Sequence, residues 1–222
     1  MELFDLYTAE REKTGRTMVR GEPVPDGYYR LVVHVCIFDP EGRMLIQQRQ
    51  PFKEGWSDLW DISVGGSAVA GDSSRSAAER ETREELGLSI NLADTRPTLT
   101  IHWDRGFDDY YAVTLAVDPA SLRLQYEEVQ AARWASREEI LQMIDDGRFI
   151  PYEKSLIDLL FFRRNHRSAH TRGDWTRGRG GVCGKGAGQI SCRIGRSLLI
   201  LTGRCCEPIN PSPRSLPGHC WT

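Results

Sequence analysis

Three glutamates crowd one short stretch of the sequence. Glu81, Glu84 and Glu85 stand at positions i, i+3 and i+4, and in an α-helix this spacing puts their side chains on one face, about 5–6 Å apart. Like charges at that distance repel, and Gly87 predicts a helix end in a left-handed turn, where the helix dipole disfavours anions again. We therefore expect a bound cation to neutralise the cluster. Oxygen-only ligands favour a hard ion, Mg²⁺ or Mn²⁺.

The residues before the glutamates are suited to start and position this helix. Ser73 is the predicted N-cap, because its hydroxyl can accept from a free amide of the first turn. Gly65 and Gly66 allow a tight loop that brings backbone carbonyls and a diphosphate close to the carboxylates. Arg80 lies one helical turn before Glu84 and is placed to hold that carboxylate.

The whole string at residues 66–88, GSAVAGDSSRSAAERETREELGL, resembles the Nudix box. Glycine, arginine, the three glutamates and the closing Gly-Leu all fall at the family's spacing. Two positions depart from the pattern: Asp72 stands where the family has glutamate, and Thr82 where an aliphatic residue is usual. Because Asp72 is one methylene shorter, we expect a group reached there to lie about an ångström further off. That departure puts full activity in doubt more than the fold.

The resemblance implies a fold, a reaction and a cofactor. The fold is an α/β/α sandwich with a mixed β-sheet, with the box helix against one face, and the similarity extends over residues 1–162. The reaction is Mg²⁺- or Mn²⁺-dependent hydrolysis of a diphosphate linkage in a nucleoside diphosphate derivative or a related organic diphosphate. The metal ligands would be Glu81, Glu84 and Glu85 with a backbone carbonyl of Gly66 or Gly65, and Arg80 would orient them.

A carboxylate must also deprotonate the attacking water. Glu81 has this role in some relatives, whereas others use a carboxylate from outside the box. Glu127 and Glu128, just before the strand predicted at residues 129–135, are the candidates in this chain. We place Glu128 among the catalytic residues and leave the choice between it and Glu81 open.

The run RQPFKEGWSDLWDISVGG before the box is similar to the corresponding run of isopentenyl-diphosphate isomerase, a branch of the same superfamily. Arg49 and Lys53 fall where that enzyme has basic residues facing its diphosphate, so we predict that they bind substrate with Gly65 and Gly66. The isomerase needs a catalytic cysteine where this chain has Gly65, and a metal-binding histidine where it has Ser67. The chain therefore lacks the isomerase chemistry, and we expect a hydrolase.

The other predicted elements are strands with helices between them, which indicates an α/β fold with a mixed sheet. We predict a hairpin in residues 2–22, strands near residues 29–38, 43–49, 60–66, 88–92, 98–103, 110–117 and 129–135, a turn at 105–109, and helices at 137–147 and 152–164. In the last helix, Leu156, Leu159, Leu160 and Phe161 suit a core face. His34, in an apolar strand, is interpreted as a core histidine with its hydrogen bonds satisfied.

Charge divides the chain of 222 residues at one seam. Residues 163–222 carry eleven basic and two acidic side chains, while residues 1–162 carry eighteen and twenty-nine. The tail is rich in Gly and Arg and holds five of the six cysteines, without the C-x₂-C pairs of a zinc site. We predict a Nudix domain at 1–162 and a disordered basic tail at 163–222.

Three function classes remain in competition: the hydrolase, a non-catalytic Nudix-fold module that binds nucleotide, and an RNA-associated protein. Nucleic acid would bind only through the basic tail, by phosphate neutralisation. No apolar run is long enough to span a membrane, and the first residues lack an export signal, so we expect a cytoplasmic protein. The substrate partner is a small-molecule diphosphate, and a homodimer is common in the family.

Overall fold

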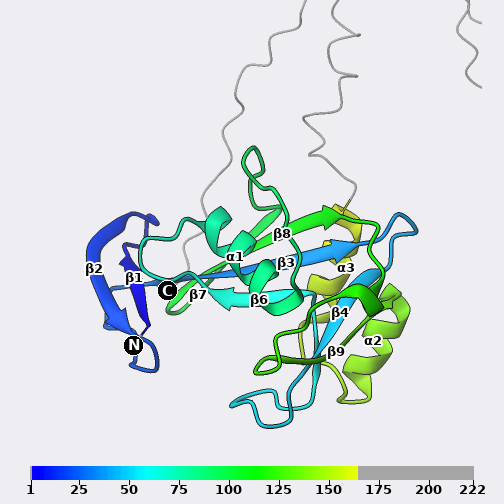
Figure 1. Cartoon of the computed structure of the whole chain (residues 1–222). Helices are drawn as coiled ribbons and strands as arrows, with labels where there is room; N and C mark the ends of the chain where they lie inside the picture. Colours follow the sequence, from blue (N-terminus) through cyan, green and yellow to red (C-terminus); the bar gives the residue numbers. More distant parts are fainter. Residues whose placement is uncertain (1, 165–222) are drawn as a thin grey trace, which may run out of the picture. The chain divides into compact units, whose positions relative to one another are not determined.

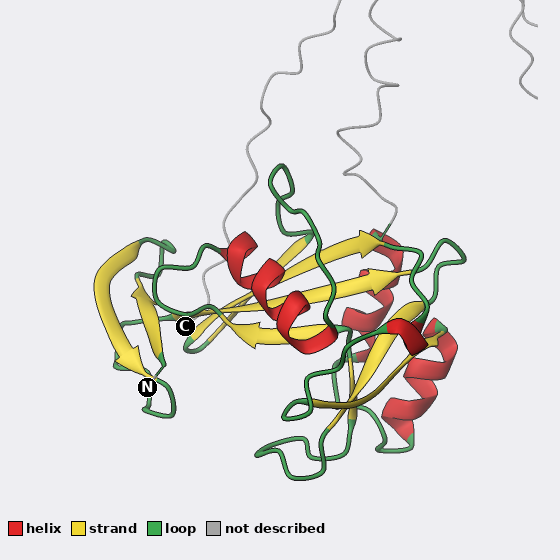
Figure 2. Ribbon diagram, in the orientation of Figure 1, coloured by secondary structure: helices red, strands yellow, loops and turns green. Residues whose placement is uncertain are grey.

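The computed structural model describes residues 2–164. Figures 1 and 2 draw this part of the chain in colour. The predictions of a disordered tail, of a nucleic-acid-binding arm and of cysteines without a zinc site fall on residues outside the described range. Within that range, none of the helices has the length and apolar character needed to span a bilayer.

The described residues form two sheets, three α-helices and one short 3₁₀ helix. The strands are β1 (Leu3–Tyr7), β2 (Lys13–Val19), β3 (Arg30–Phe38), β4 (Met44–Arg49), β5 (Trp60–Asp61), β6 (Val64–Ser67), β7 (Leu99–Trp103), β8 (Gly106–Thr114) and β9 (Val129–Ala135). The helices are α1 (Ser74–Leu86), η1 (Pro119–Ser121), α2 (Arg137–Asp145) and α3 (Lys154–Arg163).

The main sheet is mixed, as predicted. Its strands follow the order β5-β4-β3-β8-β7, with β6 also paired to β3 and β9 paired to β4. The pairing of β3 with β8 is parallel and the other pairings are antiparallel. The strands β1 and β2 form a separate antiparallel hairpin, which confirms the hairpin expected in residues 2–22.

Helices cover both faces of the main sheet, which confirms the α/β/α sandwich. Side chains alternate between the two faces of a strand, and in β3 Val33 and Val35 pack in the core on the α1 side. Cys36 and Phe38 belong instead to the cluster that contains Ile157 of α3. Figure 1 shows α1 across one face of the sheet and α3 behind the other.

Two local predictions are wrong. Residues 88–92 form a loop rather than a strand, because Leu92 is buried in the α1-side core and its amide donates to Glu79 Oε1 at 2.6 Å. The turn predicted at 105–109 is shorter, since Trp103 already pairs with Gly106 across the hairpin of β7 and β8.

The core face of α3 also differs from the prediction. Ile157, Leu160 and Phe161 are buried, and their i, i+3, i+4 spacing makes one stripe. Leu159 lies off this stripe and is 38% exposed, and Leu156 packs only at its margin. The buried face of α3 is therefore centred on Ile157, Leu160 and Phe161, and Leu156 and Leu159 lie beside it or away from it.

Candidate active site

The helix α1 forms as its sequence indicates and sets the direction of the glutamates. Ser73 Oγ accepts from the amide of Ser76 at 3.1 Å, and Gly87 ends the helix with a left-handed φ of 68°. Ala78, Thr82 and Leu86 are fully buried against the sheet. The glutamates occupy the neighbouring face of α1, beside β6.

Arg80 connects the box carboxylates. Its Nη1 donates to Glu81 Oε1 and to Glu84 Oε2, both at 3.0 Å, and its Nη2 donates to the carbonyl of Ser67 at 3.1 Å. Burial alone would lower the pKa of Arg80, but the charges of Glu81 and Asp72 outweigh it and hold that pKa above its ordinary value. The predicted orienting role of Arg80 thus has a geometric basis.

Asp72 is close enough to Arg80 despite its shorter side chain. Its Oδ2 accepts from Arg80 Nη2 at 3.0 Å and from Nε at 3.2 Å, and its Oδ1 accepts from Ser76 Oγ at 3.1 Å. The shorter side chain therefore still contacts Arg80 directly. The contact between position 72 and Arg80 is therefore present with aspartate in place of glutamate.

Glu81 lies directly against the backbone of β6. A Cβ added at Gly66 would come within 2.2 Å of the Glu81 carboxyl carbon, so a side chain at position 66 would displace the carboxylate. Burial raises the pKa of Glu81, while the neighbouring Arg80 opposes that rise. The glycine at this position thus leaves the space that the Glu81 carboxylate occupies.

Glu85 differs from the other two because no basic side chain within residues 2–164 forms an ion pair with it. Its carboxylate is buried and accepts from Gln47 Nε2 of β4 at 2.9 Å. Burial raises the pKa of Glu85 well above its ordinary value, Gln47 lowers it, and the charges of Glu81, Glu128 and Asp61 raise it further. A buried carboxylate with only an amide partner favours either a proton or a bound cation.

The divergence of β4 from β6 opens a cavity beside this cluster. The strand β3 pairs with β4 only at Phe38 and Met44, and then pairs with β6 from Val35 to Val32. The resulting cavity of about 550 Å³ has the following lining residues: Arg20, Arg30, Val32, His34, Arg49, Lys53, Trp56, Asp61, Gly65, Gly66, Ser67, Glu128, Ile150, Pro151 and Tyr152.

All four predicted substrate-binding residues line this cavity, and so does Glu128. Lys53 forms a close ion pair with Glu128, and Arg49 Nη1 lies 3.8 Å from Asp61 Oδ2. The sequence interpretation missed Arg20, Arg30, Asp61 and Tyr152. Their only sequence signal is charge or polarity at strand ends and loops, which is common on any protein surface.

Two buried polar atoms of the cavity have no hydrogen-bond partner, namely Arg49 Nε and His34 Nδ1. The His34 ring stacks on Tyr110 with centroids 4.5 Å apart, and its Nε2 lies 3.6 Å from Asp108. The prediction of a core histidine with satisfied hydrogen bonds is therefore wrong for Nδ1. A Cβ at Gly65 would lie 3.1 Å from this atom, so the glycine leaves the space beside it open.

The box glutamates lie next to the cavity but do not line it. Across the described residues, no three acidic, histidine or cysteine side chains are arranged to hold a metal ion. Arg80 forms ion pairs with Glu81 and Glu84. The clustering of these two glutamates is thus no evidence for an ion, since the chain supplies its own cation. The donor set still fits a hard divalent ion: all its atoms are carboxylate or carbonyl oxygens, and Glu85 is buried without a cationic partner among the described residues.

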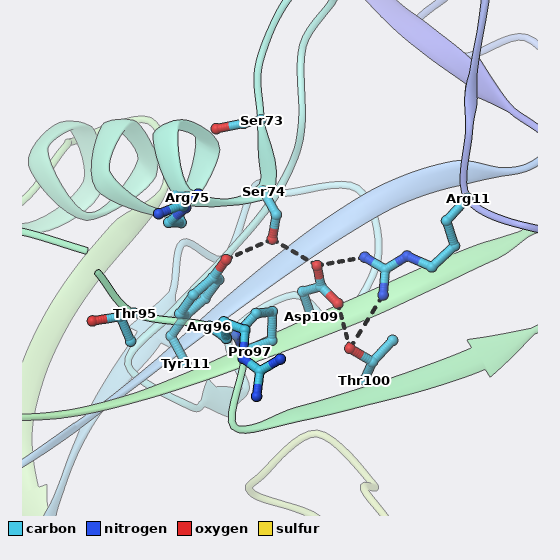
Figure 3. A pocket seen from close by; sticks show the side chains of 10 residues that line it. All are labelled: Arg11, Ser73, Ser74, Arg75, Thr95, Arg96, Pro97, Thr100, Asp109 and Tyr111. Carbon is cyan, nitrogen blue, oxygen red and sulfur yellow. Dashed lines mark hydrogen bonds and ion pairs between the residues drawn. The ribbon is translucent and has the colours of Figure 1, made fainter. Parts of the chain in front are cut away.

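A second cavity, of about 420 Å³, lies at the start of α1 (Figure 3). Its central group is the buried Asp109, which accepts from Arg11 Nη2 at 2.7 Å and from the hydroxyls of Ser74 and Thr100 at 2.6 Å. Ser74 Oγ also lies 2.8 Å from the hydroxyl of Tyr111. Every oxygen of this carboxylate is occupied by the protein itself, so the cavity is held together by its own contacts.

Comparison with known proteins agrees with the geometry. The NUDIX domain family matches residues 28–160. The chain is 46% identical to an uncharacterized Nudix hydrolase of Listeria monocytogenes over 170 residues, which are 77% of this chain and 99% of that protein. The chain therefore belongs to the Nudix hydrolase family.

Two further comparisons concern the fold and the isomerase branch. A crystal structure of DR0079 from Deinococcus radiodurans has a TM-score of 0.58 with 24% identity and covers 75% of this chain and all of that one. An isopentenyl-diphosphate Delta-isomerase of Citrobacter koseri is 28% identical over 127 residues, 54% of this chain and 68% of that protein. Gly65 and Ser67 stand in this chain where we expect the isomerase to have its cysteine and histidine.

Proposed function

We propose that this Nudix hydrolase cleaves the diphosphate linkage of a nucleoside diphosphate derivative or a related organic diphosphate, with Mg²⁺ or Mn²⁺ as cofactor. The observation that carries the proposal is the position of the carboxylate cluster on α1. It lies directly beside a cavity lined by Arg49 and Lys53, with Gly66 separating Glu81 from the cavity floor. A pyrophosphate and a divalent ion need these two kinds of group next to each other.

In this proposal the box residues hold the cation and the cavity holds the substrate. Glu81, Glu84 and Glu85 would be the ligands, with the carbonyl of Gly66 beside them. When bound, the ion supplies charge neutralisation of the phosphate oxygens and a lower pKa for the attacking water. Arg80 would keep the carboxylates oriented after its contacts to Glu81 and Glu84 are shared with the ion.

Arg49 and Lys53 would bind the diphosphate, since both are basic, largely covered from solvent and face the cavity. Lys53 is paired with Glu128 in the structure. A diphosphate that takes over Lys53 would leave Glu128 as a free carboxylate within the cavity. This exchange makes Glu128 available as general base at the moment when substrate is present, and Glu81 remains the alternative base inside the box.

The test is release of phosphate or of a nucleoside monophosphate from a panel of organic diphosphates by the full chain, with and without Mg²⁺ or Mn²⁺. We expect turnover only with the ion. Glu84→Gln and Glu85→Gln should each lower kcat by about 10³-fold or more, because each removes a charge from the ligand set at nearly constant shape.

Glu79→Gln is the matched control, because Glu79 is on the same helix and its carboxylate holds the amide of Leu92 instead of facing the cluster. Circular dichroism should show the same folded state for all three variants. Wild-type turnover in Glu84→Gln or Glu85→Gln would refute the metal assignment. Ligand binding without any turnover across the panel would indicate the non-catalytic nucleotide-binding module instead.

A further inference from the structure

Arg30 is the basic residue of the active-site cavity whose charge is least compensated. Arg20, Arg49 and Lys53 each have a carboxylate within ion-pair distance, namely those of Glu2, Asp61 and Glu128. Among the described residues, no carboxylate lies within 4.0 Å of the Arg30 guanidinium. A half-buried guanidinium without an acid partner is costly unless an anion from outside the protein completes the site.

The surroundings of Arg30 hold its side chain in place. Its guanidinium carbon lies 5.4 Å from the centroid of the Trp103 ring, and Nη1 donates to Ser67 Oγ at 3.4 Å. The nearby Asp108 is engaged elsewhere, since it accepts from Trp103 Nε1 at 2.8 Å and lies 3.6 Å from His34 Nε2. Stacking on an aromatic ring leaves the edges of a guanidinium fork free to bind an oxyanion.

The electrostatics agree with this geometry. Burial lowers the pKa of Arg30, Asp108 partly offsets this effect, and the like charge of Arg20 lowers the pKa further. Arg20 comes from the end of the hairpin of β1 and β2, so a segment outside the main sheet adds positive charge at this end of the cavity. An anion bound between the two arginines would relieve their repulsion.

Arg30 lies at the opposite end of the cavity floor from Arg49. In the pairing of β3 with β6, Gly65 faces His34 and Ser67 faces Val32, close to Arg30. Arg49 lies beside Asp61, which precedes β6. The two residues from Gly65 to Ser67 advance about 7 Å along an extended strand, so the backbone positions beside Arg49 and Arg30 are about two residues apart along β6.

We propose that Arg30 and Ser67 form a second anion subsite, which binds a phosphomonoester that the substrate carries in addition to its diphosphate. The subsite rests on the proposed function, because the diphosphate is taken to lie at Arg49 and Lys53. Arginine binds two oxygens of one phosphate through its fork, and the serine hydroxyl can donate to a third. The preferred substrate class is then an organic diphosphate with a separate terminal phosphate.

Two commercial pairs of organic diphosphates differ by one phosphomonoester and serve as probes: coenzyme A with dephospho-coenzyme A, and NADPH with NADH. Binding to the full chain is measured by calorimetry without added divalent ion, which keeps binding separate from turnover. For at least one pair, we expect the phosphorylated member to bind about tenfold or more tightly, as for a charge-assisted hydrogen bond.

Arg30→Met should remove this preference and leave the affinity for the unphosphorylated member within about twofold. Arg30→Lys should keep part of the preference, because it keeps the charge and loses the fork. Arg105→Met is the matched control, since Arg105 pairs with the exposed Asp26 outside the cavity, and its affinities should equal those of the wild type.

The proposal is overturned if the wild type binds both members of each pair equally, or if Arg30→Met weakens both members to the same extent. The second result would make Arg30 a diphosphate contact or a structural residue. The wild-type comparison decides the matter even if Arg30→Met fails to fold. A preference in binding without hydrolysis would refute the proposed function and support the subsite. Hydrolysis without a preference in binding would support the proposed function and refute the subsite.

Discussion

The cavity at Asp109 and the cavity at Gly65 differ in whether their buried polar groups have hydrogen-bond partners within the protein. Around Asp109, each carboxylate oxygen accepts from Arg11 or a hydroxyl, and the contacts join the N-terminal hairpin region, α1 and the sheet (Figure 3). Around Gly65, His34 Nδ1 and Arg49 Nε have no partner. Buried polar groups are usually paired, so we expect a ligand to supply partners for these two atoms of the cavity at Gly65.

The difference shows that a cavity rich in charged residues is not by itself a binding site. The cavity at Asp109 also contains Arg75 and Arg96 and the start of a helix, features that are often taken as an anion site. Its central charges, however, neutralise one another. We therefore expect changes there to act on stability, and changes in the cavity at Gly65 to act on binding and turnover.

Among the changes that test this contrast, Asp109→Ala is expected to have the largest effect on stability. It leaves Arg11, Ser74 and Thr100 without their common acceptor and should lower the free energy of unfolding by about 2–3 kcal/mol. The measurement is urea denaturation followed by fluorescence or circular dichroism. Asp94→Ala, at an exposed position, is the control and should change stability by less than about 0.5 kcal/mol.

At temperatures where Asp109→Ala is folded, its kcat/KM should remain within about twofold of the wild-type value. A selective loss of kcat/KM in the folded variant would break the comparison, because it would place a substrate contact at Asp109.

Lys53→Met should show the reverse pattern, with a smaller free-energy change. Lys53 and Glu128 are largely covered but keep 18% and 26% of their side-chain surface exposed, so solvent still screens their ion pair and its loss should cost less than about 1 kcal/mol of stability. Loss of a charged contact to the diphosphate should lower kcat/KM by about 10- to 100-fold. Steady-state kinetics and thermal melting measure the two effects on the same preparation.

Lys154→Met is the control for Lys53→Met, because Lys154 forms an ion pair with Asp145 on the surface, outside the cavity. It should leave kcat/KM unchanged. Equal losses of stability and kcat/KM in Lys53→Met would mean that the pair with Glu128 is structural, and the contrast between the two cavities would fail.

The smallest effect concerns pH. Burial raises the pKa of Asp61 above its ordinary value of 3.8, while His34, Tyr152 and Arg49 oppose the rise. The folded state thus holds a proton that the unfolded state releases, so stability falls as pH rises from the ordinary pKa through the raised one. Asp61→Asn should flatten this fall, measured as the melting temperature between about pH 4 and 8 without divalent ions.

In Asp61→Asn the melting temperature should still fall somewhat as pH rises. Glu81 and Glu85 also have raised pKa values and contribute in the same direction. A variant as pH-dependent as the wild type would show that Asp61 does not keep its proton on folding. The matched control is Asp118→Asn, whose side chain caps the short helix η1 on the exposed side of the molecule.

The sequence predicted those parts of the site that depend on local geometry. The i, i+3, i+4 spacing of Glu81, Glu84 and Glu85 needs only a helix, and Ser73 and Gly87 delimit that helix through contacts within a few residues. The expected roles of Gly66 and Arg80 came from the box pattern, and the structure adds the contacts that each residue makes.

The sequence could not predict features that depend on distant parts of the chain. The loop at residues 88–92 alternates like a strand, but Leu92 is buried beneath α1 and Glu79 binds its amide. In the sequence, Arg30 is an ordinary charged residue at the start of a strand. Its contacts with Ser67 of β6 and with Trp103 are visible only in the structure. The divergence of β4 from β6, which makes the cavity, follows from strand pairing alone and leaves no periodic signal.

Arg80 has a consequence for the life of the molecule in the cell. Some metalloproteins unfold when their ion is withdrawn, because the ion alone offsets the charges that hold it. Here the helix carries its own counter-charge against Glu81 and Glu84. On the proposed metal dependence, molecules synthesised during a shortage of divalent ions are then expected to stay folded but inactive, and to gain activity when the ions return.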